Sequence, residues 1–306
     1  MNTRRIVAAA PLLAAVVVAV APGPVSAQPK PGITCAYAEA GPPGPAGNRL
    51  DIRVKLPEET VALRVAANGR IRVSDDRRIK RLRCAGGGPT VTNVDRIAYK
   101  APPRAENTNL AVVTPEAFGP GTTPREQGGD GIEITATGRS ISFGAIGTES
   151  RDVITAGESE GATLIEFGAE PEGGADATIR AKNITLLAQL NGGDDEFLGD
   201  GGALFPSPML KASVSAYGGE GADRITGGRY TDYLDGGPGV DELRGSGGPD
   251  ILSGGPGSDL LDGGNGRDEL DAIDRRMDSV VCGPGTDHAD LDLIDNDLGC
   301  ETFGYP

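Results

Sequence analysis

The sequence predicts an all-β chain built as a solenoid of short strands, with a disulfide-closed cap near each end. Gly supplies 48 of the 306 residues, Trp is absent, and Phe and Tyr number six each. The core is therefore expected to be thin and made of many small contributions. Apolar and polar residues alternate along short runs that Gly-, Asp- and Pro-rich turns separate. A strict nine-residue repeat then occupies residues 218–271, which is typical of a solenoid.

The N-terminal segment predicts export. Arg4 and Arg5 precede an apolar run over residues 6–21, and Val25-Ser26-Ala27 places small residues where a signal peptidase cleaves. We expect residues 1–27 to be a signal peptide and the mature chain to be secreted, by the general or the twin-arginine route. A membrane anchor is the alternative, but Pro11 interrupts a run already short for a span. Since no second apolar run exists, the mature chain is not expected to cross a membrane.

Residues 28–104 predict a β-rich N-terminal cap unit. Residues 50–56 alternate apolar and charged side chains, and Asn68-Gly69 is a hairpin turn signal between two further alternating runs. Residues 49–104 carry 14 basic and 6 acidic side chains. This basic surface is either a solvated outer face or a binding face for an acidic polymer at a cell surface or in a matrix.

Residues 105–217 predict a less regular solenoid. Short apolar runs are separated by acidic, Gly-rich turns, and no helical period appears. The expected strands cover residues 132–136, 141–143, 153–156, 163–167, 178–181, 184–190 and 214–217.

The nine-residue repeat has six copies without an insertion. Position six is always Asp and position eight is always aliphatic, which predicts a turn of six residues followed by a strand of three. The position-six residues are Asp223, Asp232, Asp241, Asp250, Asp259 and Asp268; the position-eight residues are Ile225, Leu234, Leu243, Leu252, Leu261 and Leu270.

This spacing suits a hard cation. Glycines permit positive φ, so the turn can direct backbone carbonyl oxygens inward while the Asp carboxylate completes an oxygen cage. The expected carbonyl ligands are the glycines at positions two and four: Gly219, Gly221, Gly228, Gly237, Gly239, Gly248, Gly255, Gly257, Gly264 and Gly266.

The pattern GGxGxDxUx resembles the RTX calcium-binding nonapeptide, and the six copies are similar to the parallel β-roll of that family. Weaker copies with Asp152 and Asp195 extend the pattern upstream. The resemblance implies loops that alternate between two edges with Ca²⁺ between stacked loops, so six loops would hold about four ions. Family members typically leave the cell without a cleaved N-terminal signal, whereas this chain begins with the features of one.

Calcium is expected to control folding of the roll. Without metal, carboxylates stacked about 5 Å apart would repel by about 3 kcal/mol per pair at an effective dielectric constant near 20. The repeats carry 4 basic and 12 acidic side chains, so four Ca²⁺ would match their charge. We therefore expect the roll to be largely unfolded without Ca²⁺ and to fold when it binds.

Residues 272–306 predict an acidic C-terminal cap. The four cysteines fit an oxidising compartment and allow three pairings. Their positions in an elongated fold favour Cys35 with Cys84 and Cys282 with Cys300. A group of four tail carboxylates either forms one further calcium site or belongs to a metal-free cap that shields the last coil: Asp290, Asp292, Asp295 and Asp297.

Other functions have little support in the sequence. A net charge of −15 argues against nucleic acid. Gly157–Gly161 matches G-x-S-x-G around Ser159, and His288 follows, but no helical pattern follows the Ser as a hydrolase elbow requires. We expect a non-enzymatic protein with a structural, adhesive or surface-contact role. The alternative is an RTX-bearing polysaccharide lyase or epimerase.

Overall fold

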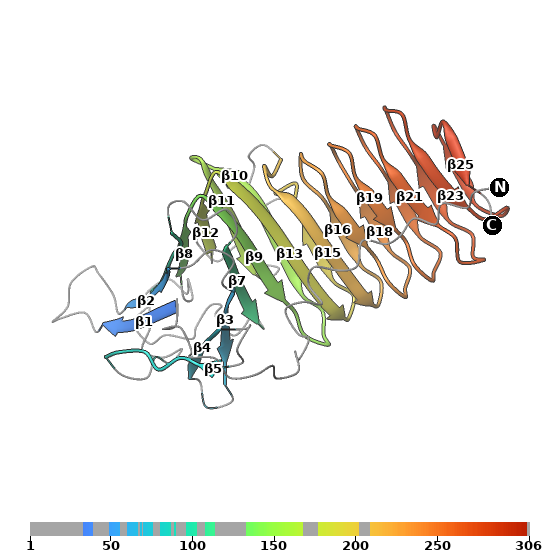
Figure 1. Cartoon of the computed structure of the whole chain (residues 1–306). Helices are drawn as coiled ribbons and strands as arrows, with labels where there is room; N and C mark the ends of the chain where they lie inside the picture. The colour runs from blue at the N-terminus through green and yellow to red at the C-terminus, as the bar shows by residue number, and fades with distance from the viewer. Residues whose placement is uncertain are drawn as a thin grey trace, which may run out of the picture.

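The computed structural model describes residues 33–38, 49–55, 60–66, 68, 70–75, 80–86, 89, 96–102, 108–113, 133–167, 177–201 and 209–304. Their strands form two sheets that face each other along an elongated molecule (Figure 1). The first sheet contains β1 Ile33–Ala38, β2 Arg49–Val54, β6 Arg96–Lys100, β8 Glu133–Thr137, β10 Val153–Ser159, β11 Ala162–Phe167, β12 Ala177–Arg180, β14 Glu196–Leu198, β16 Arg224–Thr226, β18 Glu242–Arg244, β20 Leu260–Asp262, β22 Ser279–Val281 and β24 Asn296–Leu298. The second contains β3 Thr60–Val65, β4 Ile71–Asp75, β5 Lys80–Arg81, β7 Thr108–Val113, β9 Ser140–Ile146, β13 Asn183–Gly192, β15 Ser213–Glu220, β17 Tyr233–Asp235, β19 Ile251–Ser253, β21 Glu269–Ala272, β23 His288–Leu291 and β25 Thr302–Gly304.

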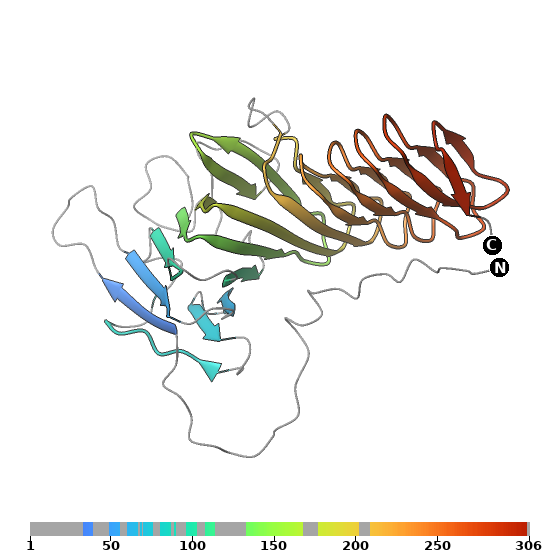
Figure 2. The ribbon, with the colours of Figure 1, turned by 45° about the horizontal axis from the view of Figure 1, so that its top comes forward.

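From β13 onward the chain winds as a β-roll. Consecutive strands go alternately to the two sheets, and each strand pairs in parallel with the strand one coil later. In β17 and β19, Tyr233 pairs with Ile251, so one coil is 18 residues, or two nonapeptides. The turned view shows the strands of successive coils stacked along the axis (Figure 2). The all-β, parallel-roll prediction is confirmed.

The core is the narrow layer between the sheets. All six position-eight side chains of the repeats are fully buried, because alternate strand residues point to opposite faces and position eight faces inward. Phe197, Val280 and Ala289 take the equivalent inward places in coils before and after the repeats. Within the repeats, each coil thus contributes only one or two aliphatic side chains per sheet, as the scarcity of aromatic residues predicted.

One stretch between the N-terminal coil and the repeats departs from the parallel winding. Strands β10, β11 and β12 pair antiparallel, and a two-residue turn at Glu160 and Gly161 joins the first two. Both turn residues have positive φ, +49° and +73°, as a tight hairpin turn requires. The G-x-S-x-G match ends in this turn, so Ser159 lies at the end of a hairpin strand and not before a helix.

The N-terminal strands begin the same two sheets. The predicted hairpin is present, with β3 and β4 antiparallel and Val65 opposite Ile71. Strand β2 pairs in parallel with β6, and β3 with β7, so residues from the basic segment form the first coil. The Cys35–Cys84 disulfide ties β1 to the chain after β5. The expected signal peptide lies outside the described residues.

The C-terminal segment continues the roll for two more coils. Strands β22 to β25 extend both sheets, and the Cys282–Cys300 disulfide joins positions 18 residues apart on adjacent coils. Both predicted cysteine pairs are therefore present. No helix long and apolar enough to cross a membrane occurs in the part of the chain that the structure describes.

Candidate metal centre

The position-six aspartates form a ladder of hydrogen bonds between coils. The backbone N–H of Asp241 donates to Oδ1 of Asp259, one coil later, at 2.9 Å, and the N–H of Asp232 donates to Oδ1 of Asp250 at 2.8 Å. The same bond recurs wherever two such residues are stacked, because the parallel register holds each Asp carboxylate under the amide of the coil before it.

The loops alternate between two edges of the roll, so there are two ladders. At one edge of the roll the chain passes from the second sheet to the first sheet, and we call this side 'edge one'. The opposite side is 'edge two'. Edge one carries Asp152, Asp195, Asp223, Asp241, Asp259, Asp278 and Asp295. Edge two carries Asp232, Asp250, Asp268, Asp287 and finally Glu301.

The other carboxylate oxygen of most ladder residues has no hydrogen-bond partner. In the second repeat, Oδ2 of Asp232 accepts the N–H of Gly228 at 2.6 Å. In the other five repeats this oxygen is buried without a partner, on an aspartate that is at most 3% exposed. Such an oxygen is costly unless a cation or donor reaches it. The oxygens are Oδ2 of Asp195, Asp223, Asp241, Asp250, Asp259, Asp268, Asp278 and Asp287, and Oδ1 of Asp152.

The glycine at position one leaves the space beside these oxygens. A Cβ on Gly236 would lie 2.5 Å from Oδ2 of Asp241 and 2.8 Å from the carbonyl oxygen of Gly254. Gly218 and Gly245 lie in the same surroundings. A carboxylate oxygen and a carbonyl oxygen of the next coil therefore converge on one point, as ligands of a bound cation do. Sequence analysis missed position one, although it is the only glycine position kept in all six copies.

The glycines at positions two and four permit close stacking of the coils. Gly219, Gly237 and Gly255 have φ of +113°, +91° and +87°. A Cβ on Gly237 would lie 2.4 Å from the carbonyl oxygen of Gly219, and one on Gly257 would lie 2.0 Å from that of Gly239. Positive φ and the close approach of the neighbouring coil's backbone therefore require glycine at these positions.

Burial also shifts the protonation of the ladder. Desolvation, with repulsion from Asp232 and Asp268, raises the pKa of Asp250 to about 8. Desolvation raises the pKa of both Asp232 and Asp241 to about 7, against the hydrogen bonds from backbone amides that lower it. Without a cation, these three carboxyls are therefore partly protonated near neutral pH.

The donor set favours Ca²⁺. No group of three or more His, Cys, Asp or Glu side chains with metal-binding geometry occurs among the described residues. Each loop instead offers one carboxylate and its backbone carbonyls. An all-oxygen set with few side chains and many carbonyls suits Ca²⁺ better than Zn²⁺, which prefers His and Cys. The residues present therefore fit the cation that the sequence predicted.

The tail carboxylates are placed differently. Oδ1 of Asp295 accepts the N–H of Asp278 at 3.0 Å, and its Oδ2 accepts the N–H of Asp292 at 2.6 Å. Oδ2 of Asp292 accepts the N–H of Asp274 at 3.0 Å. Asp290 lies 3.2 Å from Nε2 of His288, and Asp297 is exposed. These contacts favour a hydrogen-bonded cap over a further calcium site.

His288 lies at the start of β23 on the outside of the roll. Its Nδ1 is 2.9 Å from Oγ1 of Thr302, and its side chain is 38% exposed. Ser159 lies in the β10–β11 hairpin, whereas His288 lies several coils away near the C-terminal end (Figure 1). The structure does not bring these two residues together as a nucleophile and its base.

Comparison with known proteins agrees with this geometry. Residues 217–252 and 235–270 each match the family model of the RTX calcium-binding nonapeptide repeat (4 copies). No curated protein matches the chain. No solved structure matches it either. The family match covers the stretch in which both ladders have their regular 18-residue spacing. Residues 217–270 are therefore RTX calcium-binding nonapeptide repeats, and the chain is a calcium-binding repeat protein.

Proposed function

We propose that this is a secreted, non-enzymatic structural protein whose roll folds when it binds Ca²⁺ outside the cell. The observation that carries the proposal is the row of buried carboxylate oxygens without a partner on consecutive coils. A roll with so thin a core has little free energy to offset their desolvation. Ca²⁺ would supply the missing charge, and its binding free energy would then stabilise the fold.

Several further features support export. The N-terminal residues have the composition of a signal peptide, and both cysteine pairs form disulfides, which persist in oxidising compartments. Free Ca²⁺ is scarce in the cytoplasm and abundant outside cells. The chain would then stay unfolded until export and become rigid afterwards.

The test is a calcium titration of the purified chain followed by circular dichroism. We expect the β signal to rise between calcium-free buffer and millimolar Ca²⁺, and to rise less with Mg²⁺, which requires a stricter octahedral ligand set. An equal β signal with chelator and with Ca²⁺ would show that calcium does not control folding.

We further propose an adhesive role, which rests on a basic row near the N-terminal end. Arg53, Lys100 and Arg180 are exposed, and Thr137 lies between the last two, on neighbouring strands of the first sheet. Strands in a sheet lie about 4.8 Å apart, so the row presents three cations along one line. An anionic cell-surface or matrix polymer carries charges at comparable spacing and is the proposed partner.

A polysaccharide-acting enzyme is the second candidate, and a polar groove is the feature that favours it. The groove has a volume of about 560 Å³, and Glu158, Lys182, Lys211 and Tyr230 are among its lining residues. However, Oε1 of Glu158 accepts hydrogen bonds from Oγ1 of Thr163 at 2.7 Å and from the N–H of Lys211 at 3.3 Å. The carboxylate therefore has a structural role. Screening acidic polysaccharides for unsaturated or epimerised products separates the two candidates.

A further inference from the structure

We propose that a further Ca²⁺ ion binds on edge two between the loops 263–268 and 282–287, and that the Cys282–Cys300 disulfide forms the frame of this site. The ion and the disulfide then stabilise each other. The second loop lies beyond the family match, which ends at residue 270. The inference rests on the proposed calcium binding of the repeats, and the experiments below separate the two.

The loop 282–287 keeps the geometry of a repeat loop after a one-residue insertion. Gly283 has a φ of +89°, close to the +90° of Gly264 at the same position one coil earlier. Gly285 forms a parallel bridge with Gly266. The N–H of Asp268 donates to Oδ1 of Asp287 at 2.9 Å across a spacing of 19 residues. The one-residue insertion therefore lies before residue 282, and the loop itself stacks as a repeat loop does.

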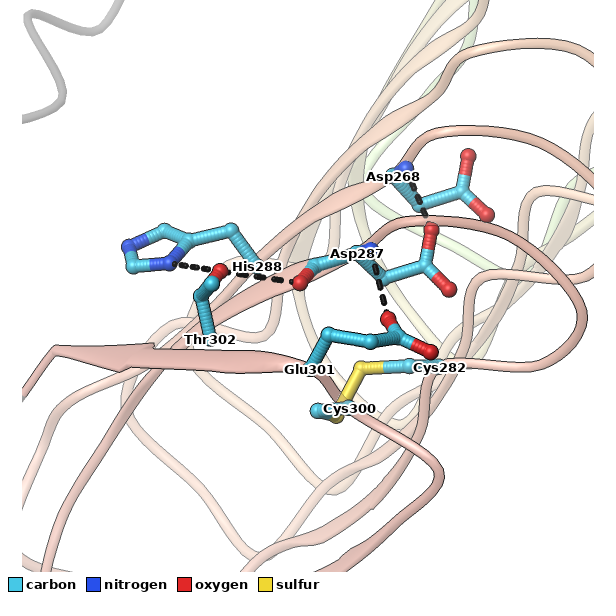
Figure 3. Close-up of a disulfide and its surroundings, with 7 residues drawn as sticks. All are labelled: Asp268, Cys282, Asp287, His288, Cys300, Glu301 and Thr302. Carbon is cyan, nitrogen blue, oxygen red and sulfur yellow. Dashed lines mark hydrogen bonds between the residues drawn. A yellow bond between two sulfur atoms is a disulfide. The ribbon is translucent and has the colours of Figure 1, made fainter.

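Two buried carboxylates face this gap, each with an oxygen that has no partner. Asp268 is fully buried and Asp287 is 1% exposed, and Oδ2 of each lacks a hydrogen bond. Figure 3 shows both carboxylates pointing the same way from adjacent coils. This is the arrangement that Asp250 and Asp268 have within the recognised repeats.

A backbone oxygen converges on the same gap. A Cβ on Gly263 would lie 2.8 Å from Oδ2 of Asp268 and 2.7 Å from the carbonyl oxygen of Cys282. In the repeats this second oxygen belongs to a position-one glycine, as Gly254 does beside Gly236. The carbonyl of Cys282 thus takes the place of a ligand carbonyl in the coil that follows the last repeat.

The disulfide holds that carbonyl in place. Cys282 is fully buried, its Cα lies 5.1 Å from that of Cys300, and its N–H donates to the carbonyl of Leu298 at 3.0 Å. The sulfur bridge therefore ties the ligand-bearing residue to the next coil (Figure 3). On edge two, each repeat loop has another regular loop beyond it, whereas loop 282–287 has a disulfide at its first residue.

The ladder ends directly after this site. The N–H of Asp287 donates to Oε2 of Glu301 at 2.7 Å, and Glu301 follows Cys300. The corresponding loop on edge one, residues 273–278, has no glycine. There, both oxygens of Asp274 accept backbone N–H groups, from Arg276 at 2.6 Å and Gly257 at 2.8 Å. Of the two loops that directly follow the recognised repeats, 273–278 and 282–287, only the second keeps the glycines of a repeat loop.

Calcium binding and formation of the Cys282–Cys300 disulfide are linked thermodynamically. If the disulfide favours the calcium-bound loop, bound calcium must favour the disulfide by the same factor. Reduction by dithiothreitol transfers two electrons and two protons to the bridge, gives the thiols of Cys282 and Cys300, and converts the reagent to its cyclic disulfide. Calcium is therefore expected to oppose this reaction.

The first experiment counts calcium. Equilibrium dialysis with radioactive Ca²⁺ on the full chain should show one fewer bound ion for Asp287→Asn, because Asn keeps the ladder acceptor and loses the charge. Asp297→Asn, at an exposed position of the next coil, is the matched control and should bind as the unmodified chain does. Unchanged binding by Asp287→Asn, with a loss in Asp241→Asn, would overturn this site and leave the proposed function intact. Loss in neither would overturn both.

The second experiment follows each disulfide during reduction, by alkylation and mass mapping. At equilibrium with reduced and oxidised dithiothreitol, calcium should favour the Cys282–Cys300 disulfide over its thiols by at least about fivefold, the lower end of typical coupling. Cys35–Cys84, at the other end of the molecule, is the internal control and should change much less. Asp287→Asn should lose this protection, while Asp297→Asn should keep it. Equal protection in both variants would show that roll folding alone shields the bridge, and would overturn the coupling.

Discussion

The backbone N–H of Asp223 donates a 2.8 Å hydrogen bond to Oδ1 of Asp241, exactly one coil later. Oδ2 of the same Asp241 is buried and has no partner. One carboxylate therefore has two separate roles: one oxygen fixes the register of the roll, and the other is available to a cation. The two roles can be separated by mutation.

Asp241→Asn should abolish calcium binding at this loop and leave the roll able to stack. The Asn carbonyl oxygen can still accept the N–H of Asp223, but it lacks the charge that Ca²⁺ requires. Asp241→Ala should also destabilise the roll by about 1–3 kcal/mol, because the buried N–H loses its acceptor. Calcium titration and chemical denaturation of both variants measure the two effects. Asp262→Asn, at a half-buried strand position, is the control, and equal calcium binding by all three variants would contradict the assignment.

Gly236→Ala should prevent cation binding at its loop. The added Cβ would lie 2.5 Å from Oδ2 of Asp241, closer than a non-bonded carbon can approach an oxygen. Gly247→Ala is the matched control, since its nearest neighbour is the Asn265 carbonyl oxygen at 3.9 Å. We expect the midpoint of calcium-induced folding to move to at least tenfold higher Ca²⁺ for the first variant, about 1.4 kcal/mol, and little for the second. Equal midpoints would contradict the assigned role of position one.

Without calcium, the roll should become less stable as pH rises. Burial raises the pKa of Asp250 to about 8 and that of Asp241 to about 7, above their ordinary values. A carboxyl whose pKa is higher in the folded state than in the unfolded state stabilises the fold at low pH. This stabilisation is complete below the unfolded-state pKa, near 4, and is lost as the pH rises through the folded-state pKa, here up to about 8. Calcium competes with these protons, so its affinity should fall between about pH 8 and about pH 5.

Circular dichroism in calcium-free and calcium-saturated buffer at these two pH values measures both trends, because the β signal reports the folded fraction of the roll. Without calcium the β signal should be larger at the lower pH, and calcium should increase it more at the higher pH. Asp250→Asn should reduce the pH dependence without calcium, because it removes the carboxyl with the highest pKa in its ladder. A calcium-free stability that rises with pH would contradict the role of the ladder.

The regular part of the fold could be predicted because its two signals coincide. Asp at position six and an aliphatic residue at position eight fix which side chains face inward, and Asp250 and Leu252 are both fully buried, as that spacing requires. The cysteine pairs followed from the order of the coils along the axis. In both cases a local pattern determines the three-dimensional position.

What could not be predicted depends on contacts between coils. Nothing local to Asp223 shows that its amide meets Asp241, because that bond exists only after parallel stacking. Strands β10, β11 and β12 alternate apolar and polar residues as solenoid strands do. The sequence pattern therefore does not show that they pair antiparallel. Loop 282–287 escaped the repeat count because Cys282 stands where Gly was expected, one residue out of register.

Reversing charge in the basic row should weaken attachment to an anionic polymer. Arg53 and Lys100 are direct neighbours on β2 and β6 and both are exposed, so Arg53→Glu with Lys100→Glu converts two adjacent cations into anions. The variant should elute from an anionic polysaccharide column at a lower salt concentration, since each lost charge contact reduces the electrostatic attraction. Arg224→Glu with Arg244→Glu, which removes two basic side chains from the roll near Glu242, is the matched control for net charge. Equal loss of retention in both variants would show that net charge alone governs binding, because the two pairs change the total by the same amount and differ only in place.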